Sequence, residues 1–190
     1  MAKIKIIIGS TRPERFGDKP GKWISELAKE YKNGDFELLD LKEINLPFLD
    51  EPKPPAEGEY EHQHTRNWAA KIDEADGFIF VTAEYNHGAP AAIKNAIDFA
   101  GKEWQHKPAV FVSYGAEAGG ARAVEQLRNV LTQLAAFPLK EQVVIANYWE
   151  NLNEKGEFVA SEYHNKKAAE LLESITLWAD EFAQIRKKLA

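Results

Sequence analysis

Two loops hold the side chains best suited to bind a small charged ligand. They are Gly9-Ser10-Thr11-Arg12-Pro13-Glu14-Arg15-Phe16-Gly17 and Thr82-Ala83-Glu84-Tyr85-Asn86-His87-Gly88-Ala89-Pro90. The first combines hydroxyl groups and two arginines with the start of a predicted helix, which are the donors that hold a phosphate group. The second places an aromatic ring and polar groups beside a glycine, which suits a flat heterocycle. Together the two loops predict a site for a phosphorylated aromatic ligand.

The first loop has a competing interpretation. Ser10, Thr11 and Arg12 follow an apolar run directly, and Gly17 permits the turn that starts the next helix. The loop is neither a Walker A sequence nor a G-x-G-x-x-G turn, so its glycine and serine alone are also compatible with an ordinary connection whose arginines are solvated. The phosphate interpretation therefore depends on the second loop lying nearby.

A third segment adds small residues to the same predicted site. Ser113-Tyr114-Gly115-Ala116-Glu117-Ala118-Gly119-Gly120 follows another apolar run and precedes a helical pattern. The positive end of that helix is expected to stabilise negative charge on a reduced ligand. The alternative is a tight strand-to-helix turn in which the glycines serve only the backbone.

The loops are connected by elements that alternate between strand and helix patterns. Short apolar runs predict strands at 4–8, 36–41, 77–81, 109–112 and 143–145, with 36–41 half polar and therefore near an edge. Helical spacing of apolar residues occurs within 23–31, 65–72, 93–100, 124–134 and 171–185, and Pro20 suits the first turn of the first helix. Residues 50–61 are acidic and rich in proline, which predicts an exposed loop.

This alternation predicts an α/β fold with a three-layer α/β/α sandwich around a five-stranded parallel sheet. We expect the strand order 2-1-3-4-5, because the reversal between the first and third strands would bring the two loops together at the carboxyl edge. With 190 residues and no internal repeat, residues 1–190 are expected to form a single domain.

Composition excludes several classes of function. The formal charge is -6 and no basic run is present, so no nucleic-acid partner is expected. The chain has no cysteine, which rules out disulfides, thiolate nucleophiles and cysteine-held metals. The apolar run near Met1 is too short for a membrane span or a signal segment, so we expect no membrane association and a cytoplasmic protein.

At these positions the chain resembles the NADPH-dependent FMN reductase family, which includes quinone, chromate and azo-dye reductases. The matching segments are Gly9-Ser10-Thr11-Arg12, Glu84-Tyr85-Asn86, Lys94-Asn95-Ala96-Ile97-Asp98 and Gly119-Gly120, in the same order and spacing. They lie within roughly residues 3 to 145, which is more specific than any one motif. The resemblance implies a flavodoxin-like fold, bound FMN and homodimers or homotetramers.

The resemblance also assigns the site. On the phosphate side it implies Ser10, Arg12, Arg15, Phe16 and Gly17. On the ring side it implies Glu84, Tyr85, Asn86, His87, Ser113, Tyr114 and Gly115. Since a flavin supplies the redox chemistry, no catalytic side chain is required. NADPH or NADH would donate two electrons, and a quinone, an azo compound, a metal oxyanion or free flavin would accept them, with Tyr85 and His87 shaping the acceptor pocket.

Other functions compete with this hypothesis. A flavodoxin-type electron carrier would bind FMN without using a pyridine nucleotide, although such carriers have little positive charge at the phosphate. A hydrolase would need Ser113 as its nucleophile, but Phe111 stands where the elbow motif has glycine. His62 and His64 have metal-ligand spacing but no evident third ligand, so solvated histidines are expected. A non-catalytic interaction module is the remaining alternative.

The tryptophans fall into two groups. Trp23, Trp68 and Trp178 lie on helical stripes and are expected to pack in the core or over the sheet. Trp104 and Trp149 lie in loop-like regions, where exposed aromatic rings near a ligand often mark a subunit interface.

Overall fold

The computed structural model describes residues 1–189, which form the predicted five-stranded parallel sheet in the order β2-β1-β3-β4-β5. The strands are β1 (Ala2–Ile8), β2 (Gly34–Asp40), β3 (Gly77–Ala83), β4 (Pro108–Tyr114) and β5 (Phe137–Ile145). Every residue of β3 and β4 is buried, because helices cover both faces of the sheet there. The edge strands β2 and β5 mix buried, half-buried and exposed residues, and the half-polar pattern at 36–41 predicts this for β2.

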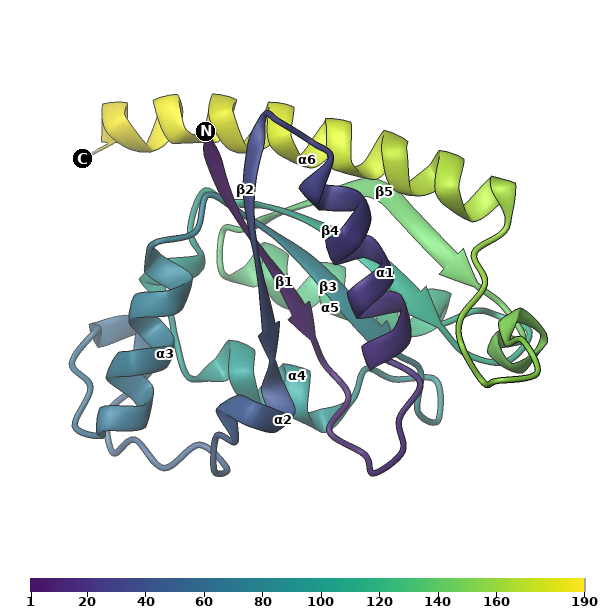
Figure 1. Ribbon diagram of the computed structural model, residues 1–190. Coiled ribbons are helices and arrows are strands. Elements are labelled where there is room, and N and C mark those ends of the chain that lie inside the picture. The colour runs from purple at the N-terminus through teal and green to yellow at the C-terminus, as the bar shows by residue number, and fades with distance from the viewer. Residues whose placement is uncertain (190) are drawn as a thin grey trace.

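Helices cover the sheet on both faces (Figure 1). The helices are α1 (Asp18–Lys29), α2 (Leu41–Ile44), α3 (Gln63–Asp73), α4 (Ala91–Asp98), α5 (Ala121–Gln133) and α6 (Glu162–Leu189), with 3₁₀ turns at Pro55–Glu57, Lys102–Trp104 and Tyr148–Asn151. Side chains of α1 and α6 share one buried apolar cluster with the sheet, and those of α3, α4 and α5 share the other. The three-layer prediction is thus confirmed.

The carboxyl ends of all five strands lie at one edge of the sheet, because every pairing is parallel. Ile8, the last residue of β1, pairs with Asp40 of β2 on one side and with Val81 of β3 on the other. The loop after β1 therefore starts between the ends of β2 and β3. This is the arrangement that the strand order predicts for a ligand site.

Two expectations about tryptophans are wrong. Trp104 is fully buried, because the 3₁₀ turn folds back over β3 and its indole N–H donates to the carbonyl of Ile97 at 3.1 Å. Trp178 is 45% exposed, because α6 turns a second apolar stripe away from the sheet. Trp149 is exposed as expected.

The segment expected to be an exposed loop is tied to the start of α3. The carboxylate of Glu51 accepts hydrogen bonds from the backbone N–H groups of Glu61 and His62 at 2.8 and 3.0 Å. His64 is not simply solvated, since its Nε2 lies 2.9 Å from Oδ1 of Asp50. Within residues 1–189, no helix combines the length and the apolar character needed to cross a bilayer.

Candidate functional site

Three loops that are far apart in the sequence meet at the carboxyl edge and line one cavity of about 200 Å³, here called the three-loop cavity. The lining residues are Arg12, Phe16, Ala83, Glu84, Tyr85, Tyr114, Gly115, Ala116, Tyr148 and Trp149. They come from the loops after β1, β3 and β4 and from the turn after β5. The structure therefore brings together the segments that the sequence marks as a site.

The two arginines of the first loop have different surroundings. The guanidinium of Arg15 is buried and forms a fork with the carboxylate of Asp40, with Nη1 at 2.8 Å from Oδ1. The same Nη1 donates to the carbonyl of Ser10. Arg12 is exposed and makes no ion pair or hydrogen bond within residues 1–189. Only Arg12 thus has its full set of donors available to a ligand.

Ser10 connects the first loop to the second. Its side chain is fully buried, and its Oγ lies 2.6 Å from the hydroxyl of Tyr85. The Arg15 contact fixes the Ser10 carbonyl at the same time. Asp40, Arg15, Ser10 and Tyr85 therefore form one network across the ends of β2, β1 and β3. The network gives the loop a defined shape before any ligand arrives.

Tyr114 lines the cavity and has a buried hydroxyl. Its side chain is 5% exposed, and its hydroxyl has no hydrogen-bond partner within residues 1–189. Burial raises the pKa of Tyr114 above its ordinary value, so the hydroxyl stays protonated. It lies over Gly17, where a Cβ atom would come within 2.5 Å of it. A buried hydroxyl without a partner costs free energy, which makes it a candidate donor for a bound group.

Aromatic rings form the floor of the cavity. Phe16 is buried, with its ring centroid 5.1 Å from that of Tyr114 and 4.7 Å from that of Tyr148. Tyr148 and the half-exposed Trp149 were missed as site residues. The signal was present, since both directly follow the strand predicted at 143–145 and so must lie at the carboxyl edge.

Glu84 lines the cavity, and its carboxylate is also hydrogen-bonded to the start of α5. Its carboxylate accepts from the backbone N–H of Arg122 at 3.1 Å and from Nε of Arg122 at 2.6 Å. Burial alone would raise the pKa of Glu84, but the hydrogen bonds and charge of Arg122 outweigh it and lower the pKa. The helix end expected to stabilise a reduced ligand is therefore already capped by a carboxylate, and that expectation needs correction.

Asn86 and His87 form the tip of the second loop. The backbone N–H groups of Tyr85 and Gly88 each donate to the other's carbonyl at 2.9 Å, and both central residues have positive φ angles, 50° and 67°. This is a tight turn that two non-glycine residues occupy at a cost in strain. Both side chains are exposed and neither lines the cavity.

Ser113 and Gly115 have backbone roles. The Ser113 Oγ is buried and donates to the carbonyl of Gly119 at 2.7 Å, while it accepts from Nε2 of Gln142 at 2.9 Å. It therefore points toward the start of α5 and not into the cavity, which corrects its ring-side placement and removes the hydrolase alternative. Gly115 lines the cavity, and a Cβ atom there would lie 3.0 Å from the backbone nitrogen of Gly120.

The fold is a flavodoxin-like α/β sandwich, and the loops form a candidate ligand site at the reversal of its strand order. The family described as NADPH-dependent FMN reductase matches residues 2–150. The chain belongs to this family, whose members are oxidoreductases that use FMN and take electrons from NAD(P)H. The resemblance seen in the sequence is thus confirmed, and a flavodoxin-type carrier is not favoured.

Three curated relatives illustrate the similarity. An NAD(P)H-dependent FMN reductase of Schizosaccharomyces pombe is 44% identical over 130 residues, which cover 67% of this chain and 64% of that protein, slightly under two thirds of its length. The NAD(P)H-dependent FMN reductase LOT6 of Saccharomyces cerevisiae is 36% identical over 68% of this chain and 73% of that protein. A quinone reductase of Pseudomonas putida is 30% identical over 69% and 70%.

A solved structure supports the fold. The flavoenzyme NAD(P)H:(acceptor) oxidoreductase FerB from Paracoccus denitrificans superposes with a TM-score of 0.75 over 96% of this chain and 99% of that chain. The identity is 22%, so this similarity bears on the architecture only.

Proposed function

We propose that residues 1–190 act as one FMN-binding domain that passes two electrons from NADPH or NADH to a small-molecule acceptor. The main support is the meeting of three loops around a cavity lined by aromatic rings, where the described residues leave Arg12 without an ion pair and the buried Tyr114 hydroxyl without a partner. Quinones are the acceptors that the names of several relatives suggest. Azo compounds, metal oxyanions and free flavin are the others.

The residues present fit FMN. Arg12 would bind its phosphate, and the turn at Tyr85 and the backbone at Gly115 would flank its ring, with the Tyr114 hydroxyl as a donor. When bound, FMN supplies the two-electron chemistry. In this proposal Arg15, Ser10 and Ser113 hold the loops in shape, because their polar groups are already engaged within the protein.

The size of the cavity bears on assembly. Ligand pockets usually enclose about 300–1,000 Å³, so a cavity of about 200 Å³ would cover only part of FMN. Two of the rings that line this cavity, Tyr85 and Trp149, are exposed to solvent. We therefore propose a homodimer or homotetramer in which a neighbouring subunit covers the rest. A monomeric mass by light scattering at full FMN occupancy would contradict this. A cytoplasmic location is part of the same proposal.

The decisive experiment is anaerobic stopped-flow mixing of the FMN-loaded protein with NADPH and, separately, with NADH. We expect the visible flavin absorbance to fall rapidly with at least one of the two. A protein that binds FMN but is not bleached would be an electron carrier. A protein that binds no flavin would contradict the whole proposal.

The phosphate assignment has its own test, in which FMN is compared with riboflavin, which lacks the phosphate. Arg12→Ala should weaken FMN binding about 30-fold, as expected for a lost charged hydrogen bond, and leave riboflavin binding unchanged. Lys29→Ala, which removes a distant exposed cation of α1, is the control. Equal losses for both flavins would show that Arg12 does not bind the phosphate.

A further inference from the structure

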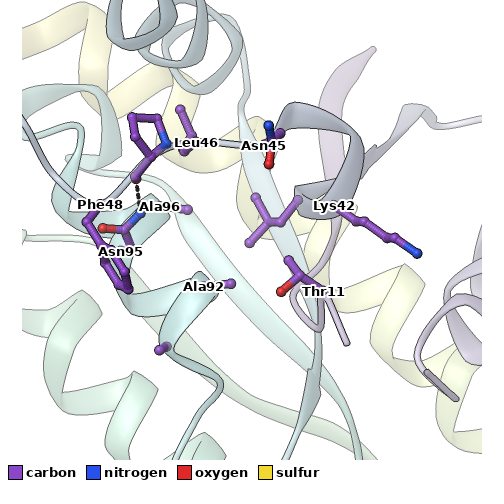
Figure 2. Close-up of a pocket in the computed structure, with 11 residues that line it drawn as sticks. Thr11, Lys42, Asn45, Leu46, Phe48, Ala92, Asn95 and Ala96 are labelled. Atoms are coloured by element: carbon purple, nitrogen blue, oxygen red, sulfur yellow. Dashed lines mark hydrogen bonds between the residues drawn. The ribbon is translucent and has the colours of Figure 1, made fainter. Parts of the chain in front are cut away.

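A second and larger pocket adjoins the first loop (Figure 2). It encloses about 540 Å³ between that loop, the segment around α2, and α4. Its walls are Thr11, Leu41, Lys42, Asn45, Leu46, Pro47, Phe48, Ala91, Ala92, Asn95 and Ala96. Thr11 lines this second pocket and Arg12 lines the three-loop cavity, so the two spaces lie on either side of adjacent residues.

An exposed aromatic ring is held in place at one end of the second pocket. Phe48 is 85% exposed, which is unusual for a phenylalanine in an ordered loop. The loop is fixed by Asn95 of α4, whose Nδ2 donates to the carbonyl of Pro47 at 2.7 Å and whose Oδ1 accepts from the N–H of Leu49 at 3.0 Å. Asn95 belongs to a motif that carries the family resemblance, and this clamp gives it a physical role.

Positive charge lies at the other end. Figure 2 shows Phe48 at one end of the pocket and Thr11 and Lys42 at the other, with the Lys42 side chain extending away from Phe48. Lys42 and Arg12 are both exposed, and neither forms an ion pair with any carboxylate in residues 1–189. Lys94 of α4, the helix that forms one wall of this pocket, is by contrast paired with Asp98. Arg12 lines the three-loop cavity and is assigned there to the phosphate of FMN, which leaves Lys42 as the cation that lines the second pocket beside the Thr11 hydroxyl. An ammonium group beside a hydroxyl group favours a phosphorylated ligand.

We propose that the second pocket binds the ADP half of the pyridine nucleotide, with adenine against Phe48 and the phosphates near Thr11 and Lys42. The volume lies within the usual range for a ligand of this size. A base stacks well on an exposed aromatic ring. The nicotinamide half would cross the first loop at Thr11 and Arg12 to reach the three-loop cavity. This inference rests on the proposed function and deepens it by naming residues that bind the electron donor.

The test measures binding of ADP to the FMN-loaded protein by isothermal titration calorimetry. ADP lacks the nicotinamide, so its binding reports on the second pocket alone. We expect Lys42→Gln and Phe48→Ala each to weaken ADP binding about tenfold, through loss of a charge contact and of a stacking surface. Lys29→Gln and Leu177→Ala remove an exposed cation and an exposed apolar side chain elsewhere, and should change nothing.

Two results would overturn the inference. One is that ADP does not bind, or binds equally to all variants. The other is that Phe48→Ala lowers the molecular mass in sedimentation while ADP binding stays the same, because a second copy of the chain would then fill the pocket. Bleaching of FMN by NADPH or NADH in the same preparation would show that the proposed function stands although the pocket assignment fails. If FMN is not bleached but ADP binding differs among the variants, the pocket assignment stands and the proposed function fails.

Discussion

The amino and carboxyl edges of the sheet differ in whether their polar side chains have partners within the protein. At the amino edge, the ammonium of buried Lys107 donates to the carbonyls of Ile72 and Asp73 at 2.8 Å each. Arg186 of α6 pairs there with Asp76. These contacts complete the C-terminal end of α3 and fasten α6 to the sheet, so this edge is built for stability.

The carboxyl edge leaves donors open. Among the described residues 1–189, Arg12 forms no ion pair or hydrogen bond, and the buried hydroxyl of Tyr114 has no hydrogen-bond partner. The comparison teaches that protein carbonyls satisfy the buried cation at the amino edge, whereas the edge with the candidate site combines satisfied donors such as Arg15 with donors that the described residues leave open.

The largest expected effect concerns the one buried ion pair of the first loop. Asp40→Ala should lower the free energy of unfolding by about 3 kcal/mol, because it leaves the buried guanidinium of Arg15 without its carboxylate. Urea denaturation measures the change. Glu26→Ala, which breaks the exposed pair with Lys29, should change stability by less than about 0.5 kcal/mol. Similar losses of unfolding free energy in both variants would mean that the buried Arg15–Asp40 pair stabilises the protein no more than an exposed ion pair does.

A second prediction concerns the amino edge and pH. Burial lowers the pKa of Lys107 from 10.5 to about 8, so the folded protein loses this proton before the unfolded chain does. Stability should therefore rise between about pH 8 and 10.5, by roughly 2–3 kcal/mol from this group alone. The neutral amine retains two N–H donors for its two carbonyls.

Lys107→Met removes this titration and provides the comparison. The difference in unfolding free energy between the wild type and the variant should change across the same pH interval, and FMN binding should be unaffected in both. A difference that is constant with pH would show that Lys107 titrates normally in the folded protein.

The smallest effect is expected at the open hydroxyl. Tyr114→Phe should stabilise the FMN-free protein by up to about 1 kcal/mol, since it removes an unsatisfied buried group. It should also weaken FMN binding about fivefold if the hydroxyl donates to the ligand. Thermal unfolding and fluorescence titration measure the two changes. A loss of stability without a change in FMN affinity would show that the Tyr114 hydroxyl stabilises the fold and does not bind FMN.

The strands and their order could be predicted, because buried parallel strands appear as short apolar runs and the site loops follow them directly. The meeting of the loops was predicted for the same reason. The role of Arg15 was not, because its partner Asp40 is 25 residues away and the contact exists only once β2 lies beside β1.

The burial of side chains in irregular segments could not be predicted from the sequence either. Nothing in the pattern around Trp104 shows that the chain there folds back onto β3, where the indole lies 4.7 Å from the ring of Phe78. In the same way, Ser113 is the last residue but one of a strand, and only the position of the α5 start decides which way its hydroxyl points. Local pattern determines elements, whereas tertiary contacts determine which way their polar atoms face.

The close approach of Tyr114 to Gly17 couples two positions that lie 97 residues apart. The φ of Gly17 is -57°, which any amino acid adopts, so only the tyrosine oxygen bars a larger residue there. In a combinatorial library randomised at positions 17 and 114, alanine at position 17 should be recovered together with phenylalanine at position 114. It should rarely be recovered together with tyrosine there. In natural sequences, we likewise expect residues other than glycine at position 17 to occur where position 114 is not tyrosine.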